Sequence, residues 1–210
     1  MTKITGSRFN MYDENNIKAV TYRECVNDVL DSEEVTKLGA FKHHHFTTRL
    51  QHSLNVSYYS YCICRFFGWD YRSAARAGLM HDLYFFENTS VDENGHRLLK
   101  NHPFDALRNS EETFDLNDIE KDAIVNHMWP CTSVCRPKYK ESMAVSLSDK
   151  FCAVMEAATG SCRFFAGKSV KAYGITVAAA AMLFMKTGGA AAATLKHASD
   201  MLKIALNFIA

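Results

Sequence analysis

Metal-ligand residue types recur along this chain at positions that periodicity assigns to separate helices. The dipeptide His81-Asp82 ends the helical stretch that begins at Tyr71, and His52 lies in the helical run that begins at Arg49. Three further residues are each inside, or at the edge of, a candidate helix of their own: His102, His127 and Asp149. The fold must therefore bring several helices together at one point if this pattern is to serve a common purpose.

Two consecutive helices are predicted around the first of these residues. Thr48 can cap a helix from residue 49 to about residue 67, and Gly68 ends it. One face of this helix carries residues at helical spacing: His52, Val56, Tyr59 and Ile63. After a turn, Asp70 can cap the helix that delivers His81-Asp82. Small residues in that second helix permit the close approach of a neighbouring helix: Ala74, Ala75, Ala77 and Gly78.

The two downstream histidines lie at opposite ends of their predicted helices. Pro103 suits a first helical turn because it has no amide proton to leave unpaired, and this puts His102 near a helix start. Asn117 begins the next helix, in which His127 is directed inward just before a stop at Trp129-Pro130. An isolated histidine in such a place is usually a helix-cap or core residue, so the case for ligation depends on the set.

The last predicted helix of this region contains a carboxylate among apolar neighbours. Ser142 can cap it, and four positions follow at near-helical spacing: Val145, Asp149, Cys152 and Glu156. An unpaired carboxylate is costly to bury, so Asp149 requires a cation or hydrogen-bond partners.

All of the predicted elements are helical, and we expect an all-α fold built around one core. The chain has 210 residues, of which 48% are apolar, and this is enough for one sizeable domain. Residues 1–40 are expected to be an N-terminal helical lead-in, loosely ordered up to about residue 18, with a helix over residues 22–30 and a second that Asp31 or Ser32 caps and Gly39 ends. Residues 41–165 would form a metal-binding helical bundle. Residues 166–210 would form Ala-rich helices packed on this domain or on a second copy in a homo-oligomer.

Composition limits the class of partner. The formal net charge is +1 with scattered basic residues, which argues against dedicated nucleic-acid binding. No apolar run is long enough to span a bilayer as one helix, and no secretory leader is evident, so a cytoplasmic protein with reduced thiols is expected. The pair Cys131 and Cys135 lacks a second thiol pair at suitable spacing, so ordinary cysteines are favoured over a zinc site.

A run of three histidines, His43 to His45, precedes the helix that contains His52. Consecutive side chains of a helix do not share a face and cannot chelate together there. We therefore expect a polar loop in which at most one of these imidazoles points at the site, where a substrate contact is favoured over a metal bond.

The order His52, His81-Asp82, Asp149 on an all-helical chain resembles the HD superfamily of metal-dependent phosphohydrolases. The resemblance covers about residues 45 to 158, and it includes the local sequence Arg-Leu-Gln-His-Ser-Leu-Asn-Val around His52 and Ala-Gly-Leu-Met-His-Asp before the dipeptide. The resemblance implies an HD-domain-like bundle, and His102-Pro103 and Asn126-His127 match the two additional histidines of members with two metals. It therefore implies a binuclear centre in which Asp82 bridges two ions.

The family resemblance assigns a ligand set to each ion. His52, His81, Asp82 and Asp149 would bind one, and His102 and His127 would bind the other. One or two divalent ions (Mn, Fe, Co, Ni, Zn or Mg) would lower the pKa of a shared water and neutralise charge on a phosphoryl group. The implied activity is hydrolysis of a phosphomonoester or phosphodiester in a small phosphorylated substrate such as a nucleotide, with Asp82 at the reacting centre.

Basic residues near these positions are candidates for binding the substrate phosphate. Arg49 lies one helical turn before His52, and Lys150 follows Asp149, so both are candidate catalytic and substrate-binding residues. A role as surface charges explains both positions equally well. Lys138 and Lys140 lie in an irregular segment, where a phosphate contact and a solvated loop explain the composition equally well.

Two other functions remain open at this point. The chain lacks the Gly-Tyr-Pro signature of the subfamily that cleaves cyclic dinucleotides, and His81-Asp82 continues into the aromatic run 83–86 instead of a lysine. A non-catalytic module of the same fold, which binds a nucleotide or a partner and retains metal, is the alternative. A helical scaffold with incidental histidines is a third, and it predicts no stoichiometric metal. The complete ligand set favours the enzyme.

Overall fold

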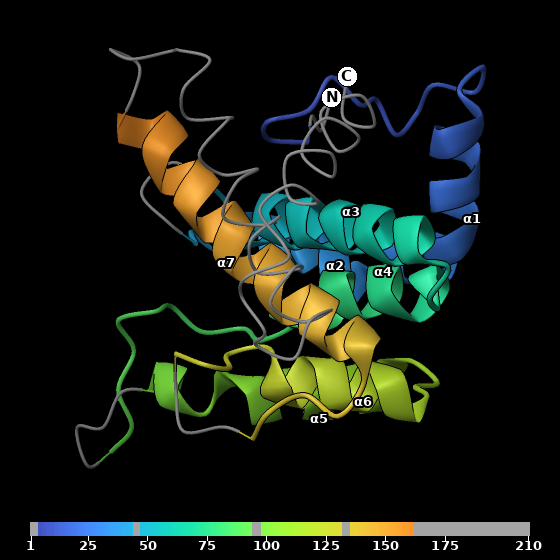
Figure 1. Cartoon of the computed structure of the whole chain (residues 1–210). Helices are drawn as coiled ribbons and strands as arrows, with labels where there is room; N and C mark the ends of the chain where they lie inside the picture. The colour runs from blue at the N-terminus through green and yellow to red at the C-terminus, as the bar shows by residue number, and fades with distance from the viewer. Residues whose placement is uncertain (1–3, 44–46, 94–97, 132–134, 162–210) are drawn as a thin grey trace, which may run out of the picture.

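The computed structural model describes residues 4–43, 47–93, 98–131 and 135–161, and in these the fold is all-α as predicted (Figure 1). The elements in chain order are α1 (Ile17–Leu30), α2 (Glu33–Lys37), η1 (Leu38–Ala40), α3 (Arg49–Phe67), α4 (Tyr71–Met80), η2 (Leu98–Lys100), α5 (His102–Thr113), α6 (Asp118–Asn126) and α7 (Lys140–Ser161). The described residues contain no strand, only an isolated antiparallel bridge between Lys42 and Thr48. The predicted Ala-rich helices of residues 166–210 lie outside the described residues.

Helix α4 is the centre of the bundle. It contacts α1, α3, α5, α6 and α7, and all eight of its residues from Ser73 to Met80 are buried. In Figure 1, α3 and α4 lie side by side, α7 crosses them diagonally, and α5 and α6 lie together beneath. Small side chains let neighbours approach a helix from several sides, and α4 has three alanines and a glycine among its buried residues.

Local sequence signals explain where most helices begin and end. The side chains of Thr48 and Asp70 each accept a hydrogen bond from a backbone N–H in the first turn of α3 and α4, as predicted. The Asn117 side chain does the same for α6, at the residue where the sequence predicted that this helix begins. Gly68 ends α3 in the left-handed conformation, with φ of 66°. Ser32 is the cap of α2, and it settles the choice left open between residues 31 and 32.

Two predicted boundaries are wrong. Helix α1 begins at Ile17, where Asn16 caps it, rather than near residue 22. Helix α7 begins at Lys140, so Ser142 lies inside the helix instead of capping it. The Ser142 hydroxyl donates to the Ile119 carbonyl at 3.3 Å and so ties α7 to α6.

The segment before α1 is packed rather than loosely ordered. The side chains of Ile4 and Met11 are fully buried. The Thr5 carbonyl accepts a hydrogen bond from the Tyr59 hydroxyl at 2.7 Å, and its N–H donates to Asn55 Oδ1 at 3.0 Å. The first part of the chain therefore belongs to the same core as α3. Among the described residues, no helix combines the length and apolarity needed to cross a bilayer.

Candidate metal centre

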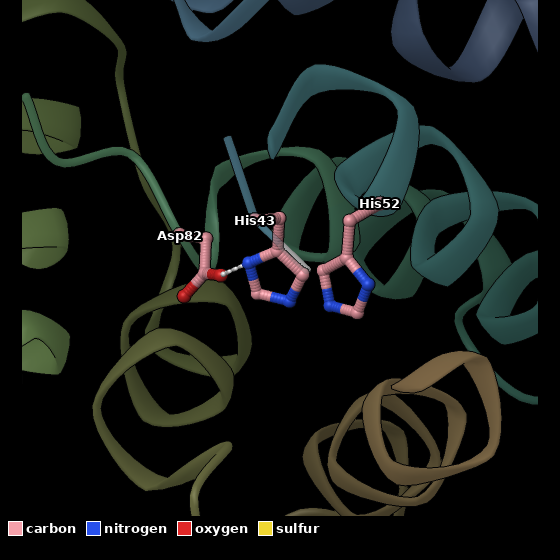
Figure 2. A group of neighbouring side chains, drawn as sticks. All are labelled: His43, His52 and Asp82. Carbon is pink, nitrogen blue, oxygen red and sulfur yellow. Dashed lines mark ion pairs between the residues drawn. The ribbon is translucent and has the colours of Figure 1, made fainter. Parts of the chain in front are cut away.

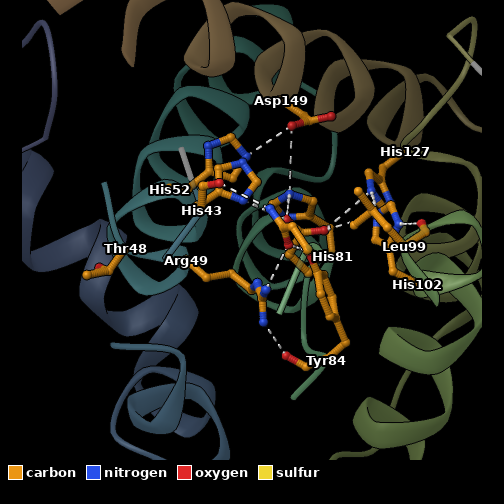
Figure 3. Close-up of polar contacts among 12 residues, drawn as sticks. His43, Thr48, Arg49, His52, His81, Tyr84, Leu99, His102, His127 and Asp149 are labelled. Atoms are coloured by element: carbon orange, nitrogen blue, oxygen red, sulfur yellow. Dashed lines mark hydrogen bonds and ion pairs between the residues drawn. The ribbon is translucent and has the colours of Figure 1, made fainter. Parts of the chain in front are cut away.

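Five helices deliver the six predicted metal ligands to one buried point (Figure 3). His52 lies in the first turn of α3 and Asp149 lies in α7, whereas His81 and His127 directly follow the last residues of α4 and α6. His102 is the first residue of α5. The exposed fraction of each of the six residues is 9% or less: His52, His81, Asp82, His102, His127 and Asp149. The structure thus brings together the whole predicted set.

The carboxylate of Asp82 faces two different groups of imidazoles. Its Oδ1 lies 3.3 Å from His102 Nε2 and 3.6 Å from His127 Nε2. Its Oδ2 lies 3.7 Å from His81 Nε2, on the side where His52 and Asp149 lie. One carboxylate oxygen therefore faces each group, which is the arrangement that a bridging ligand requires.

Three of the imidazoles have a ring orientation fixed by the backbone. Nδ1 of His81 lies 2.9 Å from the Gly78 carbonyl, Nδ1 of His102 lies 2.6 Å from the Leu99 carbonyl, and Nδ1 of His127 lies 2.7 Å from the Ile124 carbonyl. A carbonyl only accepts, so each Nδ1 must carry the proton, and in the neutral ring the Nε2 lone pair is left facing the cluster. Metal-binding histidines in proteins are oriented by this kind of hydrogen bond.

The fourth imidazole is held by a carboxylate that the sequence analysis did not assign. Nδ1 of His52 lies 3.0 Å from Glu156 Oε2, and Glu156 Oε1 accepts from Asn55 Nδ2 at 2.8 Å. The Nε2 atom of His52 then lies 3.0 Å from Asp149 Oδ1. Glu156 follows Asp149 by seven residues, two helical turns on one face of α7. That spacing was a signal from which the role of Glu156 could have been found.

Burial and charge shift the pKa values of these groups in different directions. Burial lowers the pKa of His52, but hydrogen bonds to Asp149 and Glu156 outweigh it and raise the pKa to about 10. For His127, burial and the neighbouring imidazoles His81 and His102 lower the pKa to about 3. Burial raises the pKa of Asp82, but the imidazoles of His81 and His102 outweigh it and hold that pKa well below its usual value. The centre therefore combines ionised carboxylates with at least one neutral imidazole, which are the ligand forms that a divalent ion requires.

The distances among these atoms fit divalent metal ions. Donor atoms bound about 2.1 Å from one ion are about 3.0 Å apart at right angles and about 3.4 Å apart at tetrahedral angles. His52 Nε2 lies 3.0 Å from Asp149 Oδ1, and the Asp82 oxygens lie 3.3 to 3.7 Å from Nε2 of His81, His102 and His127. His81 Nε2 lies 3.9 Å from Asp149 Oδ1. The buried atoms His81 Nε2 and Asp82 Oδ1 make no hydrogen bond. Nitrogen and oxygen donors in this number suit transition-metal ions. The described groups able to hold a metal include neither Cys131 nor Cys135.

The four basic residues predicted to bind the substrate phosphate do not all lie at the cluster. Lys150 Nζ lies 2.9 Å from Asp149 Oδ2 and also donates to the His127 carbonyl. The Arg49 guanidinium is fully buried and donates to the carbonyls of Tyr84 and Phe86 at 2.6 and 3.0 Å. Arg49 therefore fixes the loop after His81-Asp82, because its Nη atoms donate to the carbonyls of that loop.

The remaining two lysines are not part of the cluster. Lys138 is exposed, in the segment before α7. Lys140 is the first residue of α7, more than two turns from Asp149, and its Nζ lies 5.4 Å from the ring of Trp69 beyond the far end of α3. The structure does not bring Lys140 to the metal centre, since its contact with Trp69 holds it at the opposite end of the bundle.

The histidine run contributes one imidazole that can be described. His43 Nδ1 lies 3.6 Å from Asp82 Oδ2, whereas His44 and His45 lie outside the described residues.

Comparison of the chain with protein families, curated proteins and solved structures found no match. The resemblance to the HD superfamily therefore stays a prediction, and the buried His/Asp cluster is compatible with it.

Proposed function

We propose that the protein is a metal-dependent phosphohydrolase of the HD type, acting on a small phosphorylated substrate. The observation that carries this proposal is the division of the Asp82 carboxylate between two imidazole groups, 3.3 Å from His102 and 3.7 Å from His81. Two divalent ions held in this way would supply an acidified water for attack and neutralise charge on the phosphoryl group.

The exposed edge of the centre indicates where a substrate would approach. The side chain of Lys150 is 26% exposed and that of Asp149 is 12% exposed, whereas the His52 and His81 side chains are fully buried. A phosphoryl oxygen at this edge could accept a hydrogen bond from Lys150 Nζ. We therefore assign substrate binding to Lys150, and we assign loop positioning to Arg49, whose guanidinium already bonds to the backbone of residues 84 and 86.

The test is metal-dependent turnover together with metal content. Purified protein with Mn²⁺ should hydrolyse a generic phosphomonoester or phosphodiester, or a nucleotide. Asp82→Ala should lose both ions and all turnover, because it removes the shared ligand, whereas His127→Ala should lose one ion. Lys37→Ala, on the exposed surface of α2, is the control and should match the wild type.

Two results would contradict the proposal. Stoichiometric metal without turnover of any phosphoester would favour a non-catalytic module of the same fold. Equal metal content in Asp82→Ala and His127→Ala would rule out the bridging carboxylate. Elemental analysis of the purified variants measures this directly.

A further inference from the structure

His43 lies outside the helices, in the loop before α3, yet its imidazole reaches the metal centre. Its ring stacks on that of His52 with a centroid separation of 3.9 Å and an interplanar angle of 24° (Figure 2). Its Nδ1 points toward Asp82 Oδ2, 3.6 Å away. His43, His52 and Asp82 each offer one ligand atom, and these three atoms lie within 4.8 Å of one another. The side chain is 12% exposed, so the imidazole is held inside the protein.

The backbone on both sides of His43 is fixed by hydrogen bonds. The His43 N–H donates to the Thr47 carbonyl at 2.9 Å, and the Arg49 N–H donates to the Phe41 carbonyl at 2.9 Å. The His43 carbonyl accepts from Asn88 Nδ2 at 3.1 Å. Asn88 Oδ1 in turn accepts from Arg49 Nη2 and from the Tyr84 hydroxyl. The loop that follows His81-Asp82 therefore also positions His43.

Ring stacking alone would not require the direction in which Nδ1 points. Nδ1 faces the same Asp82 oxygen that His81 Nε2 faces at 3.7 Å. Its distance of 3.6 Å equals that between His127 Nε2 and Asp82 Oδ1. The relation of His43 to the bridging carboxylate is thus the same as that of two predicted ligands.

We propose that His43 is a further metal ligand, binding through Nδ1 the ion that His52, His81, Asp82 and Asp149 hold. This inference rests on the metal centre of the proposed function. A nitrogen on a loop can fill a coordination position that ligands from the helices leave open. The assignment replaces the prediction that an imidazole of this run contacts substrate.

The experiment is a titration of the metal-free protein with Co²⁺, followed by visible absorption and by competition with a chelator. His43→Phe keeps a ring that can stack on His52 but has no donor atom. His43→Asp places a carboxylate oxygen the same number of bonds from the backbone as Nδ1. Lys42→Ala, an exposed neighbour in the same loop, is the matched control.

A metal ligand at residue 43 predicts different cobalt affinities for the two His43 variants. His43→Phe should lose roughly tenfold or more in affinity for one of the two cobalt ions, with a changed visible spectrum. His43→Asp should recover the affinity, because it restores a ligand at the same place. Lys42→Ala should match the wild type in both measurements.

Wild-type cobalt affinity and spectrum in His43→Phe would overturn the inference and leave only a stacking role. Weaker cobalt binding by His43→Asp than by His43→Phe would overturn it as well. Far-ultraviolet circular dichroism checks the helical content of each variant. His43→Ser, which needs no room for a ring, takes the place of His43→Phe in the same comparison if that variant does not fold.

The outcome is separable from that of the proposed function, because cobalt binding is measured without substrate. A wild-type protein that binds cobalt but hydrolyses no phosphoester would overturn the hydrolase, and the spectra would still decide the role of His43. A wild-type protein that binds no cobalt would overturn both.

Discussion

Two of the histidines at the candidate metal centre stabilise the ends of helices while their rings face the cluster. His81 and His127 are the residues at which α4 and α6 end, and each donates from Nδ1 to a carbonyl three residues earlier. The last carbonyls of a helix have no intrahelical partner, so this hydrogen bond satisfies one of them. The same bond leaves Nε2 facing the cluster. Folding and ligand orientation therefore depend on one contact.

The pKa of His52 leads to a prediction about pH. In the metal-free protein its value of about 10 means that the ring carries two protons at neutral pH. To bind a metal through Nε2, the ring must release one of them. Below pH 10 the proton competes with the metal, so affinity should rise about tenfold for each pH unit between 7 and 9 if one proton is released. The rise should flatten above about pH 10.

The measurement is the dissociation constant for Zn²⁺ in metal buffers from pH 6.5 to 9, together with proton release in a weakly buffered solution containing a pH indicator. Glu156→Gln is the matched variant, because it removes one of the two carboxylates that raise the pKa of His52. Its affinity should flatten at a lower pH than that of the wild type. A wild-type affinity that is constant from pH 7 to 9 would contradict the assignment of His52 as a ligand.

At the scale of the elements, the close approach of α3 and α4 is what brings His52 and His81 together. The small residues of α4 permitted this prediction from the sequence. A Cβ built on Gly78 would lie 2.6 Å from Ser57 Cα and 2.8 Å from Ser57 N, which are backbone atoms of α3. Any side chain at residue 78 would therefore push the two helices apart, three residues before the first ligand of the dipeptide.

Gly78→Ala should accordingly destabilise the protein, although alanine favours helix by about 1 kcal/mol over glycine. Overpacking at backbone contacts costs roughly 1–3 kcal/mol, so we expect a net loss in the free energy of unfolding and reduced metal content. Gly39→Ala is the control, since its Cβ would meet only Leu50 Cδ2 at an ordinary 3.6 Å. Urea denaturation of the metal-free proteins measures the free energy of unfolding of both variants. Equal stability of the two variants would show that the helices can separate at no cost.

The sequence was most informative where a structure depends on neighbouring residues. Thr48, Asp70 and Asn117 cap helices because a cap needs only a side-chain oxygen and the next three backbone amides. The six candidate ligands were predicted from the family resemblance, and helical periodicity placed each of them inside, or at the edge of, a predicted helix. Ser142 failed as a cap because its hydroxyl bonds to the Ile119 carbonyl of another helix.

Residues whose partners are distant in the chain were not predictable in this way. Arg49 is basic and close to His52, as a phosphate ligand would be, but its partners are the carbonyls of residues 84 and 86. Lys140 lies on the same helix as Asp149, but more than two turns earlier, and this separation keeps it away from the site. The part played by His43 depends on a loop that Asn88 holds from 45 residues away.

At the scale of the whole molecule, one buried arginine connects the three helices α1, α4 and α6. Arg76 of α4 donates from Nε to Glu120 of α6 at 2.5 Å and pairs with Asp28 of α1. Its Nη2 donates to the Asp115 carbonyl at 3.0 Å. The Glu120 carboxylate also accepts from the Asn117 N–H at 3.0 Å, within the cap of α6. Arg76 therefore fixes the end of the bundle from which α6 runs toward His127.

Arg76→Met should lower the free energy of unfolding by roughly 3–5 kcal/mol, because it leaves the buried charge of Glu120 without its partner. Arg108→Ala is the control, since its ion pair with Asp105 lies on the surface and contributes at most about 1 kcal/mol. The double variant Arg76→Met, Glu120→Leu removes the stranded charge and should regain part of the loss. Urea denaturation compares the four proteins. A stability of Arg76→Met equal to that of Arg108→Ala would contradict the role of Arg76 in holding α6 to α4.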